Sequence, residues 1–345
     1  MKYVGVDLHK QVISVCVVMH QDGHRKIVQR QRLACQDVAG ITAFFQSLGP
    51  FEVVVEATSS YEWFFELLEP WAMRLVLAHP RKLRVIAEST RKTDKIDAHV
   101  LAEFLALDMI PQAHRPSPRV RQHRALVRQR HFLQRRITAA KCKVRHVLAR
   151  YNADIQSLFT REGRTYLTQQ PLSGADRFVV EQLLATLDHH TQLLAAITRQ
   201  LREFARSAPI AEREAREVLA KIPGVGAVTA DIVLAELGDL RRFKNQRQVA
   251  AYAGLVPRVR ESAGRVKGGG ITKEGSGLLR WALVQTAWRF VTKTRRWALA
   301  YERLKRRAGA KRAIVAIARR ILCMMFGLLR RGEKYSLARE ALAEI

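Results

Sequence analysis

The first 110 residues alternate short apolar, β-branched runs with stretches of helical periodicity, and this order constrains the fold more than any other feature. The β-branched runs predict strands over residues 3–8, 12–18, 26–33, 52–56 and 74–78, with a hairpin turn at residues 21–24. The helical spacing predicts helices over residues 37–47, 61–72, 81–88 and 94–107. Three successive strands followed by alternating helices and strands predict an α/β domain built on one mixed sheet.

Four acidic residues stand at the ends of these predicted elements. Asp7 is in the first strand, Glu56 ends the fourth, and Asp94 and Asp97 begin the last helix, where their spacing puts them on one face. The order of strands and helices along the chain is the ribonuclease-H-like layout, and the four acids fall at the positions where that layout usually carries acids. Mg²⁺ prefers oxygen ligands, and two ions about 4 Å apart hold both the attacking and the leaving oxygen of a phosphodiester. The set predicts a two-metal site, although each acid alone fits an ordinary surface or capping role.

The charge of the chain is strongly positive and unevenly distributed. Sixty Lys and Arg residues against 31 Asp and Glu residues give a formal net charge of +29, which predicts a polyanionic partner. Residues 1–108 hold thirteen basic and thirteen acidic residues, and no acid occurs between Asp108 and Asp154. We therefore expect catalysis in the first part of the chain and nucleic-acid binding in the rest.

The cysteines and the apolar runs predict a cytoplasmic protein. Cys16, Cys35, Cys142 and Cys323 show no metal-binding or disulfide spacing, so we expect buried thiols in a reducing compartment. The chain starts on a strand pattern without a signal-type apolar region. Its longest apolar run, residues 321–329, is shorter than the roughly 20 residues that a membrane span needs, so no membrane partner is expected.

The middle of the chain predicts two long helices. Prolines at 111, 116 and 118 mark a linker, and helical patterns follow over residues 119–151 and 177–206. The second helix has an approximate heptad seam of Val180, Leu183, Leu184, Leu187, Leu194, Ile197, Leu201 and Phe204. The two helices are expected to pair as an antiparallel coiled coil, within one chain or between chains. A helical bundle without an oligomeric role fits the pattern equally well.

The last third predicts a mainly helical domain with two candidate nucleic-acid contacts. Helices over residues 212–221 and 227–237 flank Ile222-Pro223-Gly224-Val225-Gly226, a hairpin like a helix-hairpin-helix element, in which Gly224 and Gly226 let backbone N–H groups approach a phosphate. Residues 258–275 predict a basic, glycine-rich loop, and residues 278–291 and 296–331 predict helices. The residues of the 258–275 loop that we expect to bind phosphate are Arg258, Arg260, Arg265, Lys267 and Lys273.

These patterns together resemble one family. Gly5–Lys10, Glu56-Ala57-Thr58 and Lys92–Ala98 are similar to motifs of the DEDD transposases of the IS-one-ten type, including the IS-eleven-eleven branch. Further similar motifs follow in the family's order in the C-terminal part: Ile222–Gly226, Ala253-Gly254-Leu255-Val256-Pro257, and Ile271–Gly275 followed by Leu279-Arg280. The resemblance covers nearly the whole chain.

The resemblance implies an insertion-sequence recombinase with three parts: a RuvC-like catalytic domain over residues 1–110, basic linker and coiled-coil helices over residues 111–210, and a C-terminal transposase domain over residues 211–345. It implies two Mg²⁺ ions, with Mn²⁺ as a substitute, held by Asp7, Glu56, Asp94 and Asp97. It also implies a serine nucleophile, which by motif position is Ser262, with Ser276 as the second candidate.

The partners that the resemblance implies are double-stranded donor and target DNA, a structured bridge RNA that pairs with both, and further copies of the chain in a dimer or tetramer. The setting it implies is the nucleoid of a prokaryote. The acids alone also fit a RuvC-like junction endonuclease that uses water and has no role for Ser262. A non-catalytic nucleic-acid-binding protein is a third possibility, which leaves the ordered acids unexplained.

Overall fold

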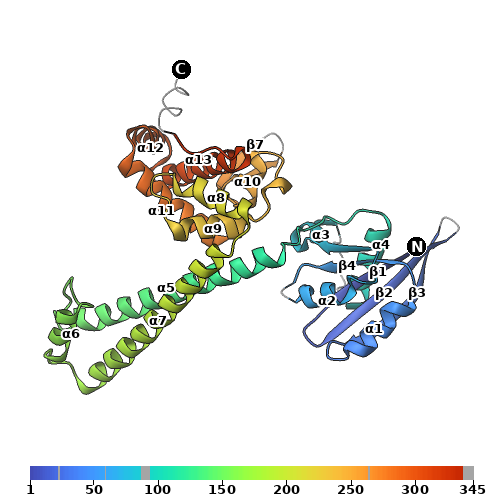
Figure 1. Ribbon diagram of the computed structural model, residues 1–345, viewed down its shortest axis with the longest axis horizontal. Coiled ribbons are helices and arrows are strands. Elements are labelled where there is room, and N and C mark those ends of the chain that lie inside the picture. Colours follow the sequence, from blue (N-terminus) through green and yellow to red (C-terminus); the bar gives the residue numbers. More distant parts are fainter. Residues whose placement is uncertain (22–23, 59, 87–93, 263–264, 337–345) are drawn as a thin grey trace. The chain divides into compact units, whose positions relative to one another are not determined.

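The computed structural model describes residues 1–21, 24–58, 60–86, 94–262 and 265–336, without the side chains of 21, 84–86, 94–97, 259–262 and 265–268. The predicted turn residues Asp22 and Gly23 therefore lie outside the described residues. The chain divides into two compact units, Met1–Arg115 and Pro116–Ile345 (Figure 1).

The first unit is a five-stranded sheet covered by helices, as the sequence predicts. The strand order is β3-β2-β1-β4-β5, with β2 antiparallel to β1 and β3, and with β1, β4 and β5 parallel. The strands are β1 Lys2–Leu8, β2 Val12–Gln21, β3 His24–Ala34, β4 Phe51–Glu56 and β5 Arg74–Ala78. The helices are α1 Val38–Ser47, α2 Tyr61–Leu68, α3 Pro80–Ile86 and α4 Asp94–Ala106.

The two faces of this sheet have separate hydrophobic cores. Val4 and Val6 of β1 pack with residues of α1 and α2 on one face. On the other face Val54 of β4 packs with Leu101 of α4, and Cys16 of β2 packs with Ala98 and Ala102 of the same helix. Side chains alternate between the faces along each strand, so every second residue of β1, β2 and β4 faces α4.

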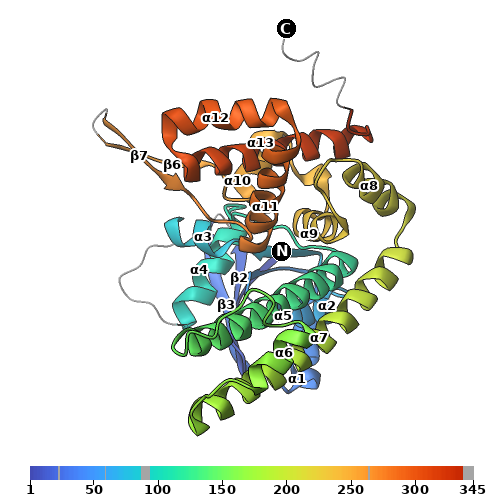
Figure 2. The same ribbon diagram turned by 90° about the vertical axis from the view of Figure 1, so that its left-hand side faces the viewer.

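The second unit is mainly helical. Its helices are α5 Pro118–Ala149, α6 Arg161–Thr168, α7 Gly174–Arg206, α8 Ile210–Ala220, α9 Ala227–Leu237, α10 Gln246–Tyr252, α11 Gly277–Lys293, α12 Arg295–Ala308 and α13 Ala310–Arg331, with a 3-10 turn η1 at Leu240–Arg242. A two-stranded hairpin of β6 Pro257–Ser262 and β7 Arg265–Ile271 extends from the helices (Figure 2). Residues of α8, α9, α11 and α13 form the largest buried core.

The long helices α5 and α7 lie side by side and antiparallel within one chain (Figures 1 and 2). Val127, early in α5, packs in one core with Leu201, late in α7, whereas Val144 packs with Val180 at the other end of the pair. The predicted pairing is thus present within one chain. Phe132, which belongs to the apolar pattern of α5, is 45% exposed.

Several sequence predictions for this unit were wrong in detail. Residues 258–275 form a hairpin over most of their length and not a loop. The helix predicted over residues 296–331 is two helices that separate at Gly309, and α6 and α10 were not predicted.

The expectation of four buried thiols holds for one cysteine of the chain: only Cys16 is buried, and Cys142 is exposed. Within the described ranges, no helix is long and apolar enough to cross a membrane.

Candidate functional site

Asp7 and Glu56 lie side by side at one edge of the sheet. The parallel pairing of β1 with β4 aligns Val6 with Val55, so the next residues along the two strands are Asp7 and Glu56. Both carboxylates are partly exposed and alternate onto the face that α4 covers. His9 contacts Asp7 through its Nε2, 3.1 Å from Oδ2. The structure thus brings two of the four predicted acids to adjacent strand ends.

The first turn of α4 carries the other two acids. Ala98, the residue after Asp97, packs so closely on β1 that a Cβ atom at Gly5 would lie 2.0 Å from its carbonyl oxygen. Only glycine allows this approach. Gly5 is two residues before Asp7, so the two residues lie on the same face of the strand. The helix backbone begins at Asp94 as predicted, but the side chains of Asp94 and Asp97 lie outside the described residues.

Ser14 is a polar residue of this edge that the sequence interpretation missed. It pairs directly with Asp7 across β1 and β2, and it is 4% exposed. It alternates onto the α4 face with Cys16, whose thiol pKa is raised by burial, an effect that Arg30 opposes. Its Oγ has no hydrogen-bond partner in the described part of the chain. A serine within a strand pattern gives no signal in the sequence; only its place opposite Asp7 distinguishes it.

The oxygen atoms at this edge are of the type that binds hard divalent cations. Asp7 and Glu56 supply carboxylate oxygens, and the Ser14 hydroxyl is a buried polar group without a partner in the described residues. Among the side chains that the structure describes, which exclude those of Asp94 and Asp97, no group of three or more His, Cys, Asp or Glu residues could hold a metal. The His99 ring contacts Glu103 on its own helix, at 3.3 Å, which gives it an ordinary surface role.

Ser262, the predicted nucleophile, is the last residue of β6 and pairs with Arg265 of β7. Its side chain, like those of Arg260, Arg265 and Lys267, lies outside the described residues. Ser276, the second candidate, caps α11: its Oγ accepts a hydrogen bond from the Leu279 N–H at 3.2 Å. A capping role accounts for Ser276 without any chemistry.

The base of the β6–β7 hairpin is fixed by backbone contacts. A Cβ atom at Gly254 would lie 2.6 Å from the Glu274 nitrogen, and one at Gly275 would lie 1.9 Å from the Tyr252 carbonyl oxygen, so the two segments cross in direct contact. Arg280 of α11 donates hydrogen bonds to the carbonyls of Ala253 and Gly275. Burial lowers the pKa of this guanidinium. The motif residues therefore hold the hairpin, and Ser262 with it, on α11.

The remaining predicted nucleic-acid contacts lie in the same unit. Arg258 donates to the Thr272 carbonyl, and Lys273 is exposed. The Gly224 carbonyl accepts a hydrogen bond from Arg289 of α11. Gly226 is the N-cap of α9 and makes no side-chain cap, so the first N–H groups of α9 lack that partner.

Part of the positive charge of α5 has a structural role. Arg128 donates two hydrogen bonds, at 2.9 and 3.0 Å, to Glu236 of α9, which is 1% exposed. Arg124 donates to the Ala235 and Glu236 carbonyls, and Arg119 pairs with Glu212 of α8. These arginines join α5 to α8 and α9, so part of the positive charge of the acid-free stretch is used in contacts within the protein.

Two family models match the chain. A transposase model of the DEDD type matches residues 4–153, and the model described as "Transposase IS116/IS110/IS902 family" matches residues 216–302. The first match includes Asp7, Glu56, Asp94 and Asp97, and the second includes Ser262 and Ser276.

Several curated proteins are similar over nearly the whole chain. The transposase for insertion sequence element IS1111A of Coxiella burnetii is 26% identical over 97% of this chain and 91% of its own length. A probable family 20 transposase of Pseudomonas aeruginosa is 28% identical over 96% and 98%. A pilin gene-inverting protein of Moraxella bovis is 25% identical over 96% and 97%.

Proposed function

We propose that this chain, which belongs to the IS116/IS110/IS902 family of transposases, cuts and rejoins DNA strands with a carboxylate-bound pair of divalent cations and a serine nucleophile. One observation carries the proposal: Asp7 and Glu56 lie at the carboxyl ends of adjacent parallel strands, on the face covered by α4, whose first turn carries Asp94 and Asp97. We assign the first unit to the RuvC-like, ribonuclease-H-like domains on this basis.

The cations are Mg²⁺, with Mn²⁺ as a substitute, and the residues that would hold them are the four acids. When bound, such ions stabilise negative charge on the oxygens around the reacting phosphorus. The Asp7 and Glu56 carboxylates bring the charge that binds them, and Ser14 offers a hydroxyl beside Asp7.

Ser262 supplies the nucleophile in this proposal. Its Oγ loses a proton and forms a bond to a DNA phosphorus, while one ester bond of that phosphodiester breaks and its oxygen leaves as a hydroxyl after taking up a proton. A phosphoserine ester keeps the bond energy of the phosphodiester, so a DNA hydroxyl can attack it and rejoin the strands. Support comes from the hairpin, which Arg280 and Gly275 anchor at its base.

A structured guide RNA and further copies of the chain complete the proposed assembly. The net charge of +29 is the excess of basic over acidic residues, so no internal ion pair can neutralise it, and it favours a polyanionic partner. Joining two duplexes requires several strand cleavages, and one serine performs one cleavage at a time. We therefore propose a dimer or tetramer that holds donor DNA, target DNA and the RNA.

Cleavage by acid variants tests the metal site. Asp7→Asn and Asp97→Asn should reduce Mg²⁺-dependent cleavage of DNA that carries the element's ends by at least roughly 10²-fold. Asp37→Asn is the matched control, because Asp37 caps α1 and asparagine caps a helix equally well. Full cleavage by Asp7→Asn would contradict the four-carboxylate site.

A pair of serine variants tests the nucleophile. Ser262→Ala should abolish strand exchange and leave DNA binding intact. Ser276→Ala should lower the free energy of unfolding by about 1 kcal/mol, because the helix cap is removed, and leave strand exchange intact. Strand exchange that survives in the first variant and disappears in a folded second variant would move the nucleophile to Ser276.

A further inference from the structure

A second basic feature lies away from the β6–β7 hairpin, where α5, α7, α8 and α9 meet. A cleft with room for about 380 Å³ opens there. Four arginines from three helices line it: Arg130 of α5, Arg202 and Arg206 of α7, and Arg216 of α8. Asp231 of α9 is the only carboxylate among its described lining residues.

The single carboxylate is already engaged. Asp231 accepts a hydrogen bond from Arg216, and its Oδ1 lies 3.1 Å from the His123 ring nitrogen in a buried contact. Arg216 also contacts Glu212 on its own helix. Asp231 and Glu212 therefore balance the charges of Arg216 and its neighbours, and little negative charge remains for the other three arginines.

Arg130, Arg202 and Arg206 have no ion-pair partner in the described part of the chain. Arg202 and Arg206 are exposed, lie four residues apart on α7 and line the cleft. Arg130 is half-buried, and burial lowers the pKa of its guanidinium while Asp231 opposes this effect. Three like charges around one cleft repel each other unless an anion lies between them.

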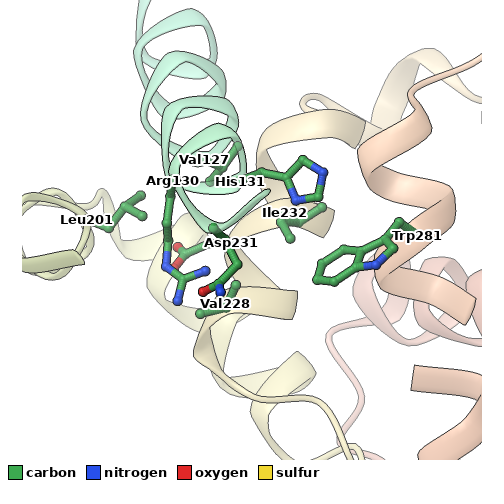
Figure 3. Close-up of a pocket in the computed structure, with 9 residues that line it drawn as sticks. Val127, Arg130, His131, Leu201, Val228, Asp231, Ile232 and Trp281 are labelled. Atoms are coloured by element: carbon green, nitrogen blue, oxygen red, sulfur yellow. The ribbon is translucent and has the colours of Figure 1, made fainter. Parts of the chain in front are cut away.

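Three guanidinium nitrogens at the cleft, Nε of Arg130 and Nε and Nη2 of Arg216, have no hydrogen-bond acceptor among the residues described. All three atoms are out of reach of solvent. Figure 3 shows Arg130 and His131, neighbours on α5, turned to different sides, with Arg130 toward α9 and α7 and His131 toward Trp281. A buried donor without an acceptor is costly, so the protein's own acceptors leave the positive charge at this part of the cleft incompletely satisfied.

The start of α9 contributes to the same cleft. Ala227 and Val228, the first residues of α9, line it. Gly226 provides no side-chain cap, so the N–H groups of this turn and the positive end of the helix dipole add to the guanidinium charges. Arginine forks and helix N–H groups are together the donors that recognise phosphate oxygens.

We propose that this arginine cleft, lined by Arg130, Arg202, Arg206 and Arg216, binds a phosphate of a nucleic-acid backbone. The site goes beyond the proposed reaction, because it requires neither the four acids nor Ser262. It rests only on the chain acting on nucleic acid. A phosphate held where the long helix pair meets α9 would fix the register of the strand on the second unit without reading its sequence.

Matched double variants of the full-length chain test the cleft. Arg202→Gln/Arg206→Gln removes two cleft charges, whereas Arg199→Gln/Arg213→Gln removes two exposed charges from α7 and α8 that do not line the cleft. Binding is measured by fluorescence anisotropy with a labelled duplex DNA and, separately, a labelled stem-loop RNA, over a series of KCl concentrations. Thermal unfolding of both variants shows that each is folded.

The cleft variant should bind about tenfold or more weakly than the control variant. Its slope of log K against log salt should be smaller by about 1 for each phosphate that the variant no longer neutralises. Weaker binding to DNA alone assigns the phosphate to DNA, and weaker binding to RNA alone assigns it to RNA. Equal binding of the two variants to both probes would overturn the proposal. Because no cleavage is measured, failure of the recombination mechanism would not affect this result.

Discussion

Gly5 of β1 and Ala98 of α4 are in direct backbone contact, since a Cβ atom at residue 5 would lie 2.0 Å from the Ala98 carbonyl oxygen and 2.5 Å from the Ala102 nitrogen. This contact sets the distance between the first turn of α4 and the strand that carries Asp7. It explains why a glycine stands between Val4 and Val6 in the strand.

Gly5→Ala should therefore push α4 away from the sheet. Overpacking against backbone atoms predicts a loss of about 3 kcal/mol in the free energy of unfolding, measured by urea denaturation, together with a loss of metal-dependent cleavage. Gly174→Ala is the control, because nothing lies within 4 Å of a Cβ atom there. A Gly5→Ala variant as stable and active as the control would show that the helix does not pack as described.

Ser14→Ala should have opposite effects with and without a divalent cation. Without one, removal of a buried hydroxyl that lacks a partner should raise the free energy of unfolding by up to about 1 kcal/mol. With Mn²⁺, the rise in melting temperature should be smaller than in the unsubstituted protein, because Ser14 lies opposite Asp7. An equal Mn²⁺-dependent rise in both proteins would remove Ser14 from the site.

Removing only one partner of the ion pair between Arg128 and Glu236 should destabilise the fold more than replacing both partners. Arg128→Ala leaves the buried Glu236 carboxylate uncompensated, and we expect a loss of about 3 kcal/mol in the free energy of unfolding. Arg128→Met/Glu236→Leu should recover most of that loss, since an apolar pair avoids the buried charge. Chemical denaturation of the three proteins tests this, and additive losses in the double variant would contradict it.

His131 should titrate below its ordinary range. Burial lowers the pKa of its imidazole, and the charges of Arg135 and Arg130 lower it further. Because the unfolded state then binds the proton more tightly, the stabilising contribution is present above the ordinary pKa of about 6.5 and is lost as the pH falls through the lower folded pKa. NMR titration should show a His131 pKa below about 6.5, and in Arg135→Gln this pKa should rise toward the ordinary value. A His131 pKa at or above 6.5 would contradict the described surroundings.

The strand and helix order of the first unit was predictable because each element follows its own pattern. β4 and β5 are continuous apolar runs with acids or a proline at their ends, and such runs pair in parallel beneath covering helices. That Asp7 and Glu56 lie at the same edge of the sheet follows from this order, because the parallel strands β1 and β4 both carry an acid near their carboxyl ends. The place of Ser14 opposite Asp7 does not follow from it, because it depends on the register of β2 against β1.

The second unit was predictable in its helices and less so in its contacts. Gly268, Gly269 and Gly270 favour a loop in the sequence, yet all three belong to β7, in which Gly268 pairs with Val259 of β6. α6 has only two buried residues and is set by the Thr160 cap, so its pattern is weak. The arginines of α5 all indicate a polyanion in the sequence, whereas Arg128 is tied to a carboxylate 108 residues away.

The central claim is tested most directly by trapping the reaction. The full chain, together with any RNA that copurifies with it, is incubated with Mg²⁺ and labelled DNA carrying the element's ends, then denatured and digested for mass spectrometry. The account predicts a covalent protein–DNA adduct whose peptide carries a nucleotide on Ser262, absent in Asp7→Asn. Cleaved DNA with free ends and no adduct on any serine would contradict it, and would assign the acids to a nuclease that uses water.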